Sequence, residues 1–348
     1  MKKVLSVLSV ATLSLSLVLA GCGSKPEAQP QGQTGSNGGA PAAKAIKVGM
    51  VTDVGGVNDN SFNQSAWEGL QKLQTDLNLP KENVNYLQSK SDADYVPNLT
   101  QFVKDGWDLT WGIGFLMGDH LKKVANENKN AKLAIIDAEV DAPNVTSVLF
   151  KEHEGSFLAG VVAAKMTKTK KVGFVGGVDI PVIKRFDLGF EAGVKAVDPS
   201  IQVIKVYTGA FDKPDMGKST ASSMYGQGVD IIFHASGGTG DGVFNEAKDR
   251  KAKGENVWVI GVDKDQSLTF GDEITLTSMV KRVDEAVIRV AKDLSEGKFQ
   301  GGVQWLGLAE NGVGLADTST KNVPEDVLKL VEEYKQKIVK GEITVPDK

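Results

Sequence analysis

Residues 46–63 of the chain are Ile46-Lys-Val-Gly-Met-Val51-Thr-Asp53-Val-Gly55-Gly56-Val-Asn-Asp59-Asn60-Ser61-Phe62-Asn63. The first six residues are mostly apolar, as in a buried strand, and the two glycines after them permit a tight turn. Apolar residues then share one face of a helix at Ala66, Leu70, Leu73 and Leu77. Strand, turn and amphipathic helix in this order form the repeating unit of an α/β protein.

The same unit recurs along the rest of the chain. Short, nearly continuous apolar runs predict parallel strands that are covered on both faces, at Ile46–Val51, Val84–Leu87, Leu109–Ile113, Leu133–Ile136, Val145–Leu149, Lys171–Val175, Ile201–Val206, Asp230–Phe233, Val257–Val262 and Ile274–Ser278. Helical spacing predicts one late helix with Val283, Val287, Val290 and Leu294 on one face, and a last helix that Pro324 opens. Two successive runs of such units predict two doubly wound lobes, although no short tandem repeat is visible.

Ligands of open α/β sheets bind beyond the carboxyl ends of the strands, so the loop after the first strand is a candidate site. Phe62 stands at a helix start, where packing does not require an aromatic ring. With Asp53, Asp59 and Asn63 beside it, the ring suits a flat ligand that has polar edges. The alternative is a purely structural turn, in which Asn60 or Ser61 caps the helix and Phe62 is a hydrophobic staple.

Two loops in the second half are also unusual. Residues 235–242 are glycine-rich but do not match the G-x-G-x-x-G pattern, and Asp241 would repel a phosphate. That carboxylate suits a hydroxylated ligand such as a sugar diol, or it simply caps the next helix. Residues 261–266 place Lys264 between two acids, an arrangement more typical of a salt bridge than of a catalytic amine.

Composition and motifs disfavour several classes of protein. The 348 residues are 41% hydrophobic with a net charge of −4 and no strongly basic block, which disfavours nucleic-acid binding. One cysteine excludes a disulfide framework and a cysteine-built metal cluster. The three histidines are scattered and no G-x-S-x-G elbow appears, so we predict no enzyme activity, no cofactor and no metal site.

The amino-terminal segment has the pattern of a targeting signal followed by a flexible tether. Lys2 and Lys3 precede an apolar stretch that ends in Leu19-Ala-Gly-Cys22, which resembles a bacterial lipobox. We predict a signal peptide over residues 1–21 and a lipidated Cys22 with acyl chains such as palmitate; the alternative is an ordinary secretory signal with a chance cysteine. Residues 23–45 are rich in Gly and Pro and are expected to be a flexible tether. The protein is therefore expected at the extracytoplasmic face of a cell membrane.

Several further segments share the pattern of one family. They are Ile113-Gly-Phe115, Lys171-Val-Gly-Phe-Val-Gly-Gly177, Gly189-Phe-Glu-Ala-Gly193, Thr208-Gly-Ala-Phe-Asp212, Gly237-Gly-Thr-Gly-Asp-Gly-Val243, Gly261-Val-Asp-Lys-Asp-Gln266 and Thr277-Ser-Met-Val-Lys281. Together with residues 53–63, they resemble the basic membrane lipoproteins, the purine nucleoside receptors of ABC importers. The resemblance spans roughly Ile46 to Leu315.

The resemblance implies a type I periplasmic-binding-protein fold with two Rossmann-like lobes joined by a three-segment hinge. On this basis we expect a two-lobed ligand-binding domain over residues 46–348. Lobe 1 is expected to hold residues 46–150 and 263–280, and lobe 2 residues 151–262 and 281–302, before a carboxyl-terminal tail and helix at 303–348.

The resemblance also implies ligand contacts. Phe62 and Phe211, one from each lobe, would stack on the purine, while Asp241 and Lys264 would hold the ribose. Asp53, Asp59, Asn63 and Asp137 would make base-edge and structural hydrogen bonds. The matching segments add three positions to the expected ligand-binding set: Phe115, Gly238 and Asp263.

The implied function is capture of purine nucleosides for an ABC permease and its ATPase, by a monomer attached to the membrane through its lipid anchor. Two alternatives stay open on the same fold. One is a receptor for another small hydroxylated ligand, such as a sugar or a quorum signal. The other is a sensor that reports ligand binding to a membrane partner.

Overall fold

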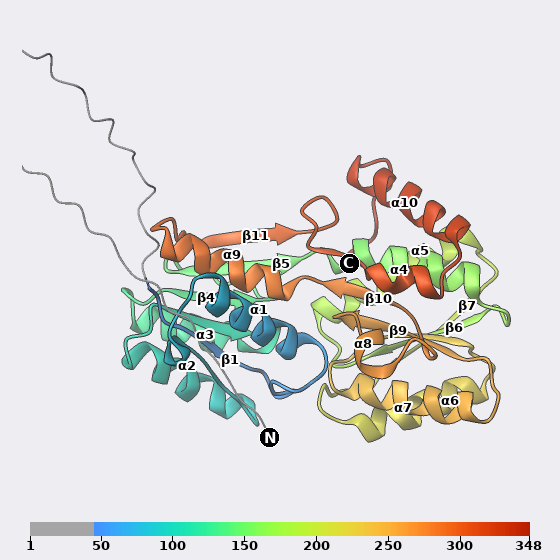
Figure 1. Cartoon of the computed structure of the whole chain (residues 1–348), viewed down its shortest axis with the longest axis horizontal. Helices are drawn as coiled ribbons and strands as arrows, with labels where there is room; N and C mark the ends of the chain where they lie inside the picture. The colour runs from blue at the N-terminus through green and yellow to red at the C-terminus, as the bar shows by residue number, and fades with distance from the viewer. Residues whose placement is uncertain (1–44) are drawn as a thin grey trace, which may run out of the picture. The chain divides into compact units, whose positions relative to one another are not determined.

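The computed structural model describes residues 45–348, which contain two sheets with helices on their faces (Figure 1). The expected signal peptide, Cys22 and the tether up to residue 44 lie outside the described residues. No helix within 45–348 has both the length and the apolar character needed to cross a membrane.

The first sheet has the strand order β11-β5-β4-β3-β1-β2, and every neighbouring pair is parallel. Its strands are β1 (Val48–Val51), β2 (Val84–Leu87), β3 (Leu109–Ile113), β4 (Leu133–Ile136), β5 (Val145–Phe150) and β11 (Gly302–Leu306). All side chains of β1, β3, β4 and β5 are buried, as expected for strands covered on both faces.

The second sheet has the order β12-β10-β9-β8-β6-β7, in which only the short β12 runs antiparallel to its neighbour. Its strands are β6 (Lys171–Gly176), β7 (Gln202–Tyr207), β8 (Ile231–Ala235), β9 (Trp258–Asp263), β10 (Thr275–Lys281) and β12 (Val313–Leu315). The ten predicted strands all exist, with ends that differ from the predicted ones by at most three residues. Sequence reasoning missed β11 and β12.

The helices flank the two sheets. Beside the first sheet lie α1 (Phe62–Asp76), α2 (Tyr95–Lys104), α3 (Gly118–Glu127) and α9 (Val283–Ser295). The second sheet carries α4 (Glu152–Met166), α5 (Pro181–Val197), α6 (Pro214–Gly226), α7 (Thr239–Ala252), α8 (Ser267–Phe270) and α10 (Glu325–Val339). Four 3₁₀ turns complete the described part: η1 (Lys81–Asn83), η2 (Asp92–Asp94), η3 (Phe115–Met117) and η4 (Asp317–Lys321). Pro324 precedes the last helix by one residue instead of standing in its first turn.

The structure corrects the expected division of the later residues between the lobes. Strand β10 pairs with β9 in the second sheet, so residues 275–281 belong to lobe 2 rather than lobe 1. Helix α9 buries its apolar face beside α1, and β11 pairs with β5, which places residues 283–306 in lobe 1. A strand joins the sheet edge with which it pairs and buries its apolar side chains most favourably. The linear sequence does not reveal which edge that is.

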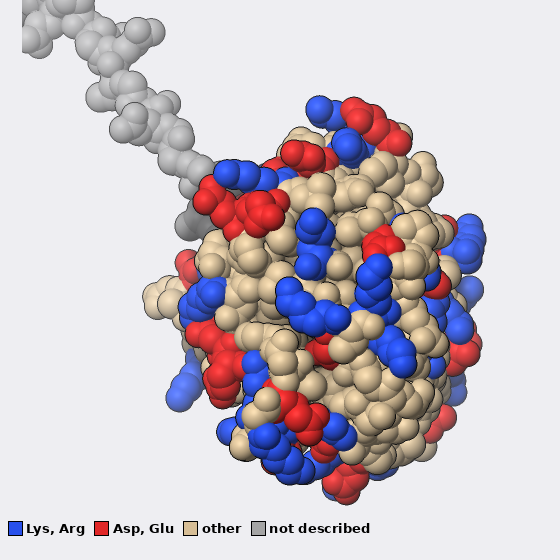
Figure 2. All heavy atoms as spheres, turned by 90° about the vertical axis from the view of Figure 1, so that its right-hand side faces the viewer, with Lys and Arg blue, Asp and Glu red and all other residues tan. Residues whose placement is uncertain are grey.

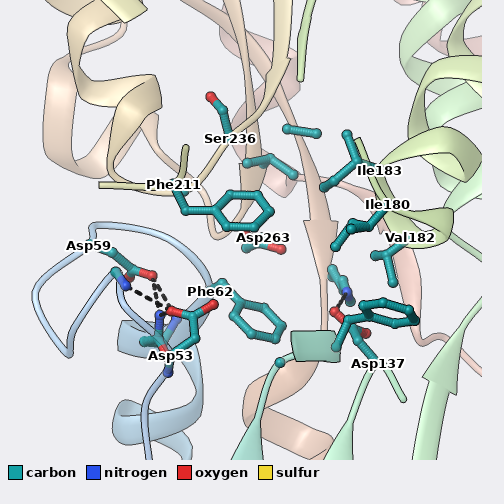
Figure 3. Close-up of a pocket in the computed structure, with 18 of the residues that line it drawn as sticks. Asp53, Asp59, Phe62, Asp137, Ile180, Val182, Ile183, Phe211, Ser236 and Asp263 are labelled. Atoms are coloured by element: carbon teal, nitrogen blue, oxygen red, sulfur yellow. Dashed lines mark hydrogen bonds and ion pairs between the residues drawn. The ribbon is translucent and has the colours of Figure 1, made fainter. Parts of the chain in front are cut away.

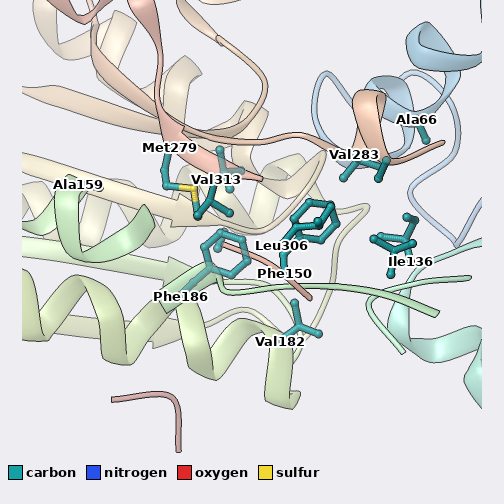
Figure 4. Close-up of a cluster of buried hydrophobic side chains, with 14 of the residues drawn as sticks. Ala66, Ile136, Phe150, Ala159, Val182, Phe186, Met279, Val283, Leu306 and Val313 are labelled. Atoms are coloured by element: carbon teal, nitrogen blue, oxygen red, sulfur yellow. The ribbon is translucent and has the colours of Figure 1, made fainter. Parts of the chain in front are cut away.

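The described chain therefore crosses between the lobes three times, after β5, after β10 and after β11. A cluster of buried apolar side chains continues through these crossings (Figure 4). It joins Ile136 and Phe150 of lobe 1 to Phe186, Met279 and Val313 of lobe 2. The two lobes thus share packed core at the hinge.

The outer face of lobe 2 carries interspersed acidic and basic side chains (Figure 2). Several ion pairs in this lobe are exposed, among them Lys218–Asp249 at 2.6 Å and Lys170–Asp198 at 3.3 Å. Such exposed pairs add little to the free energy of unfolding, because water and salt screen them.

Candidate ligand-binding cleft

A cavity of about 570 Å³, including its open mouth, lies where the carboxyl ends of the two sheets face each other (Figure 3). Its lining residues follow or end strands of both sheets: Asp53 after β1, Gly114 after β3, Asp137 after β4, Ile180 after β6, Phe211 after β7, Ser236 after β8, Asp263 in β9 and Lys281 in β10. The cavity therefore has the position that open α/β sheets favour for ligands.

Lobe 1 contributes a connected group of two carboxylates and an amide. Asn63 donates from its side-chain nitrogen to Asp53 Oδ1 at 2.8 Å and to Asp59 Oδ2 at 2.9 Å. The side-chain oxygen of Asn63 accepts the backbone N–H of Asp53 at 3.2 Å, and Asp53 Oδ1 also accepts the backbone N–H of Gly55 at 2.9 Å. These bonds fix Asp53 and Asn63 as a rigid polar edge of the cavity.

The side chain of Asp59 caps helix α1, rather than that of Asn60 or Ser61, which the structural alternative invoked. The Asp59 carboxylate accepts the backbone N–H groups of Ser61, Asn63 and Gln64 at 2.9–3.0 Å. A carboxylate at this position also interacts favourably with the positive end of the helix dipole. Phe62 is thereby held at the first turn of α1, with its ring on the cavity.

Burial raises the pKa of several cavity carboxyls. Burial raises the pKa of Asp53 to about 6, against the opposing effect of its hydrogen bonds. Burial likewise raises the pKa of Asp263 to about 7, although Lys281 counteracts this shift, and it raises the pKa of Asp59. Asp53 and Asp263 therefore change protonation in or near the physiological range, which is typical of binding sites.

The hinge end of the cavity holds a buried charge cluster. The Lys281 ammonium is 1% exposed and lies 2.6 Å from Asp137 Oδ2 and 3.1 Å from Glu152 Oε1. Arg185 pairs with Glu152 at 2.6 Å. The ammonium also lies 5.0 Å from the ring centre of Phe62, within cation–π range. Asp137 Oδ1 is buried on the cavity without a hydrogen-bond donor from the protein, so it can accept one from a ligand.

Phenylalanines from both lobes line the space between the polar edge and this cluster (Figure 3). Phe62 comes from lobe 1 and Phe211 from lobe 2, and both rings face the cavity. Beyond them, an apolar wall is built mainly from the start of α5, and it consists of Leu116, Ile180, Val182, Ile183 and Phe186. The cavity thus combines a polar edge, two flat apolar surfaces and a charged end.

Eight of the eleven residues expected to bind the ligand line this cavity: Asp53, Asp59, Phe62, Asn63, Phe115, Asp137, Phe211 and Asp263. Gly238 lies just outside it, against Asp59 and the carbonyl of Phe211. Asp241 and Lys264, the expected ribose contacts, do not line it. Asp241 accepts a hydrogen bond from Asn60 at 2.9 Å, and Lys264 pairs with Glu68 at 2.6 Å.

The two departures have simple causes. Lys264 is engaged outside the cavity by its ion pair with Glu68. Asp241 stands in the first turn of α7 rather than at its cap, and that turn faces the loop of lobe 1. Lys264 forms a salt bridge, as its acidic neighbours suggested, but its partner is Glu68 of the other lobe.

Sequence reasoning assigned no role to Lys281, Phe186 or the residues at the start of α5. One signal was present for Lys281, a lysine three residues after the predicted buried strand Ile274–Ser278, which carries no other charge up to that point. A buried lysine requires nearby carboxylates, which directs attention to a charged site. The residues of α5 gave no such signal, because apolar side chains in a first helical turn are common.

Two α/β lobes, three crossings and a cavity between the lobes are the architecture of the periplasmic-binding-protein type. Among residues 45–348, no cluster of three or more His, Cys, Asp or Glu side chains is arranged to hold a metal ion.

Comparison with known proteins agrees with this class. Residues 46–348 match the model of the Bmp family, described as ABC transporter substrate-binding protein PnrA-like, and the chain belongs to this family. It is 48% identical to the CD4+ T-cell-stimulating antigen of Listeria innocua over 363 aligned residues, and the alignment covers 100% of each chain. It is 39% identical to the ABC transporter nucleoside-binding protein BmpA of Lactococcus lactis subsp. cremoris, over 100% of this chain and 99% of that one.

A solved structure is also similar. The ABC transporter solute-binding protein of Aeropyrum pernix has a TM-score of 0.79 and 34% identity, over 87% of this chain and 94% of that one. The two parallel-sheet lobes are therefore those of ABC solute-binding proteins, as the fold prediction stated.

Proposed function

We propose that this chain captures purine nucleosides in the cleft between its lobes and delivers them to an ABC importer. The family supports a substrate-binding role, and the Lactococcus relative is named as nucleoside-binding. The observation that carries the proposal is the pair Phe62 and Phe211, one ring from each lobe on the same cavity beside the polar edge of Asp53 and Asn63.

The base binds between the two rings. Stacking of a base on an aromatic side chain contributes about 1–3 kcal/mol. Asp53 Oδ2 then meets the polar edge of the purine, and the amide of Asn63 holds this carboxylate in place through Asp53 Oδ1. Since the pKa of Asp53 is about 6, its carboxylate accepts hydrogen bonds from N–H groups of the base at neutral pH.

The ribose lies at the charged end of the cavity. We assign its hydroxyl contacts to Asp137, Asp263 and Lys281, in place of Asp241 and Lys264. The three assigned groups line the cavity, and Asp137 Oδ1 is a free acceptor. Hydrogen bonds to charged groups contribute about 1.5–3 kcal/mol each.

Charge balance favours nucleosides over nucleotides. Four aspartates line the cavity, against one lysine that is already paired with Asp137 and Glu152. A phosphate group would meet this excess of carboxylate charge without a free cation to offset it. We therefore expect nucleoside monophosphates to bind much more weakly than the nucleosides.

The cellular setting is part of the proposal. An acylated Cys22 holds the receptor at the extracytoplasmic face of the cell membrane, and residues 23–45 act as its tether. The receptor is a monomer, and its partners are the permease and ATPase subunits. Ligand closes the two lobes by binding the closed form more tightly than the open one.

Calorimetry tests the proposal. Inosine, guanosine and adenosine are expected to bind, hypoxanthine much more weakly, and ribose or arabinose least. Binding of a free pentose without any nucleoside would instead support the sugar receptor. A nucleobase that binds as tightly as its nucleoside would remove the ribose contacts from the proposal.

A further inference from the structure

A loop of lobe 1 contacts lobe 2 directly beside the cavity. The Asn60 side-chain nitrogen donates to Asp241 Oδ2 at 2.9 Å, and the Asn60 backbone carbonyl accepts from the Gln266 side chain at 3.0 Å. Next to it, the Ser61 hydroxyl donates to Asp263 Oδ2. One short segment of lobe 1 therefore holds three residues of lobe 2.

The loop of lobe 1 is shaped for this contact. Asn60 has a φ of +52°, a left-handed conformation that asparagine tolerates better than most residues. Its backbone N–H donates to Gln64 at 3.1 Å, and the N–H of Ser61 donates to Asp59 at 3.0 Å. These local bonds hold the loop so that both the carbonyl and the side-chain amide of Asn60 point at lobe 2.

The Gln266 side of the contact is fixed as well. Gln266 is fully buried, and its Oε1 accepts the backbone N–H of Val262 at 2.9 Å while His234 Nε2 lies 2.8 Å away. Burial lowers the pKa of His234 to about 4, so the ring is neutral at physiological pH. Its Nε2 then carries the proton and donates to Gln266. The amide nitrogen of Gln266 consequently faces Asn60.

Asn60, Asp241 and Gln266 do not line the ligand cavity. We propose that these three residues form an inter-lobe latch, which positions the closed form of the receptor and changes the affinity for every ligand by the same factor. The proposal rests on the proposed binding function for its ligand readout. It makes Asp241 a positioning residue rather than a ribose contact.

The uniform factor follows from population arithmetic. Apparent affinity falls in proportion to the fraction of receptor that adopts the binding-competent form. A latch outside the cavity changes that fraction without changing any contact to the ligand. A residue that touches ligand would instead weaken some ligands more than others.

The variant Asn60→Asp tests the latch, because aspartate keeps the backbone conformation while it places a second carboxylate against Asp241. We expect binding of inosine, guanosine and adenosine to weaken by about tenfold or more, with their ratios unchanged. The swap Asn60→Asp with Asp241→Asn restores a donor–acceptor pair, and we expect affinities within about threefold of the wild type. Glu68→Gln is the matched control: it removes the exposed inter-lobe pair with Lys264 and should change affinity less than about twofold.

Three results would overturn the latch: unchanged affinity in Asn60→Asp, a swap that fails to restore binding, or a loss that differs between ligands. Hydrogen–deuterium exchange of residues 57–62 in the ligand-free full chain gives a separate readout. We expect faster exchange in Asn60→Asp than in the wild type and in the swap, and equal exchange in all three also overturns the latch. If no nucleoside binds the wild type, the proposed function fails and the exchange experiment still decides on the latch.

Discussion

The two lobes share a scaffold and differ in what they present to the cleft. Their sheets have the same strand order once equivalent strands are matched, with β4 corresponding to β9. Each of these two strands leads to a buried aspartate on the cavity, Asp137 with a φ of +71° and Asp263 with a φ of +63°. The same left-handed turn therefore places a carboxylate from each lobe, although no repeat is visible in the sequence.

The loops after β1 and β6 show the difference. The loop of lobe 1 aims Asp53 and Asn63 into the cavity. In lobe 2, Asp179 is 61% exposed and pairs with Lys184 at 3.1 Å, while Ile180 and Val182 line the cavity. At this pair of loops the scaffold thus supplies polar side chains from lobe 1 and an apolar wall from lobe 2.

Lys281→Met should give the largest effect. Among the described residues, Lys281 of lobe 2 is the only cation that lines the cavity, whereas four aspartates line it. The variant leaves Asp137 without its buried partner. We expect the free energy of unfolding to fall by about 3–5 kcal/mol and nucleoside binding to be lost. Chemical denaturation and calorimetry measure the two quantities.

A second variant separates stability from recognition. Lys281→Met combined with Asp137→Asn removes both charges and should recover part of the stability without recovering binding. If the single variant were as stable as the wild type, Lys281 would not balance the buried acids.

Phe62→Ala and Phe211→Ala compare the two lobes directly. Both rings are only partly buried in the protein, so we expect each variant to keep most of the stability of the ligand-free form. Each should weaken nucleoside binding by about 1–3 kcal/mol, because one stacking surface is lost. Full affinity in one variant alone would mean that the base rests on a single lobe. A steep drop in melting temperature with retained affinity in Phe62→Ala would support the staple interpretation.

Asp263→Asn tests the carboxyl that ends β9. Its pKa rises from 3.8 to about 7 in the folded protein, chiefly through burial. Between these values the native state binds more protons than the unfolded chain, so unfolding free energy falls as pH rises, by about 1.4 kcal/mol per pH unit for this group. The variant lacks this dependence.

Urea unfolding at pH 5 and pH 8 measures the difference between the wild type and Asp263→Asn. We expect the wild type to lose stability relative to the variant on going to pH 8. An equal change in both proteins would place the pKa of Asp263 near its ordinary value.

Lys264→Met should give the smallest effect. Its partner Glu68 is 46% exposed, so the pair contributes less than about 1 kcal/mol to stability, and neither residue lines the cavity. Affinity is expected to stay within about twofold of the wild type by calorimetry. A large loss of nucleoside binding would return Lys264 to the ribose contacts.

Most of the fold was predictable because local patterns determine strands and helices. The apolar runs of the ten predicted strands and the spacing of Val283, Val287 and Val290 each imply burial without knowledge of the partner. The lobe of β10 and α9 was not predictable, because it depends on which sheet edge and which helix accept them. The short strand β12 has too few residues to produce a pattern.

The sequence by itself determined the loops that form the cleft, since strand ends in an α/β protein meet at one edge and Asp53, Phe62 and Phe211 stand after such ends. Only the tertiary structure decided which charged groups enter the cavity. The sequence pointed to Lys264 and not to Lys281, but the folded chain buries Lys281 among carboxylates and leaves Lys264 paired with Glu68 outside the cavity. The physical reason is that a side chain's partners come from both lobes, and contacts between distant segments exist only in the folded chain.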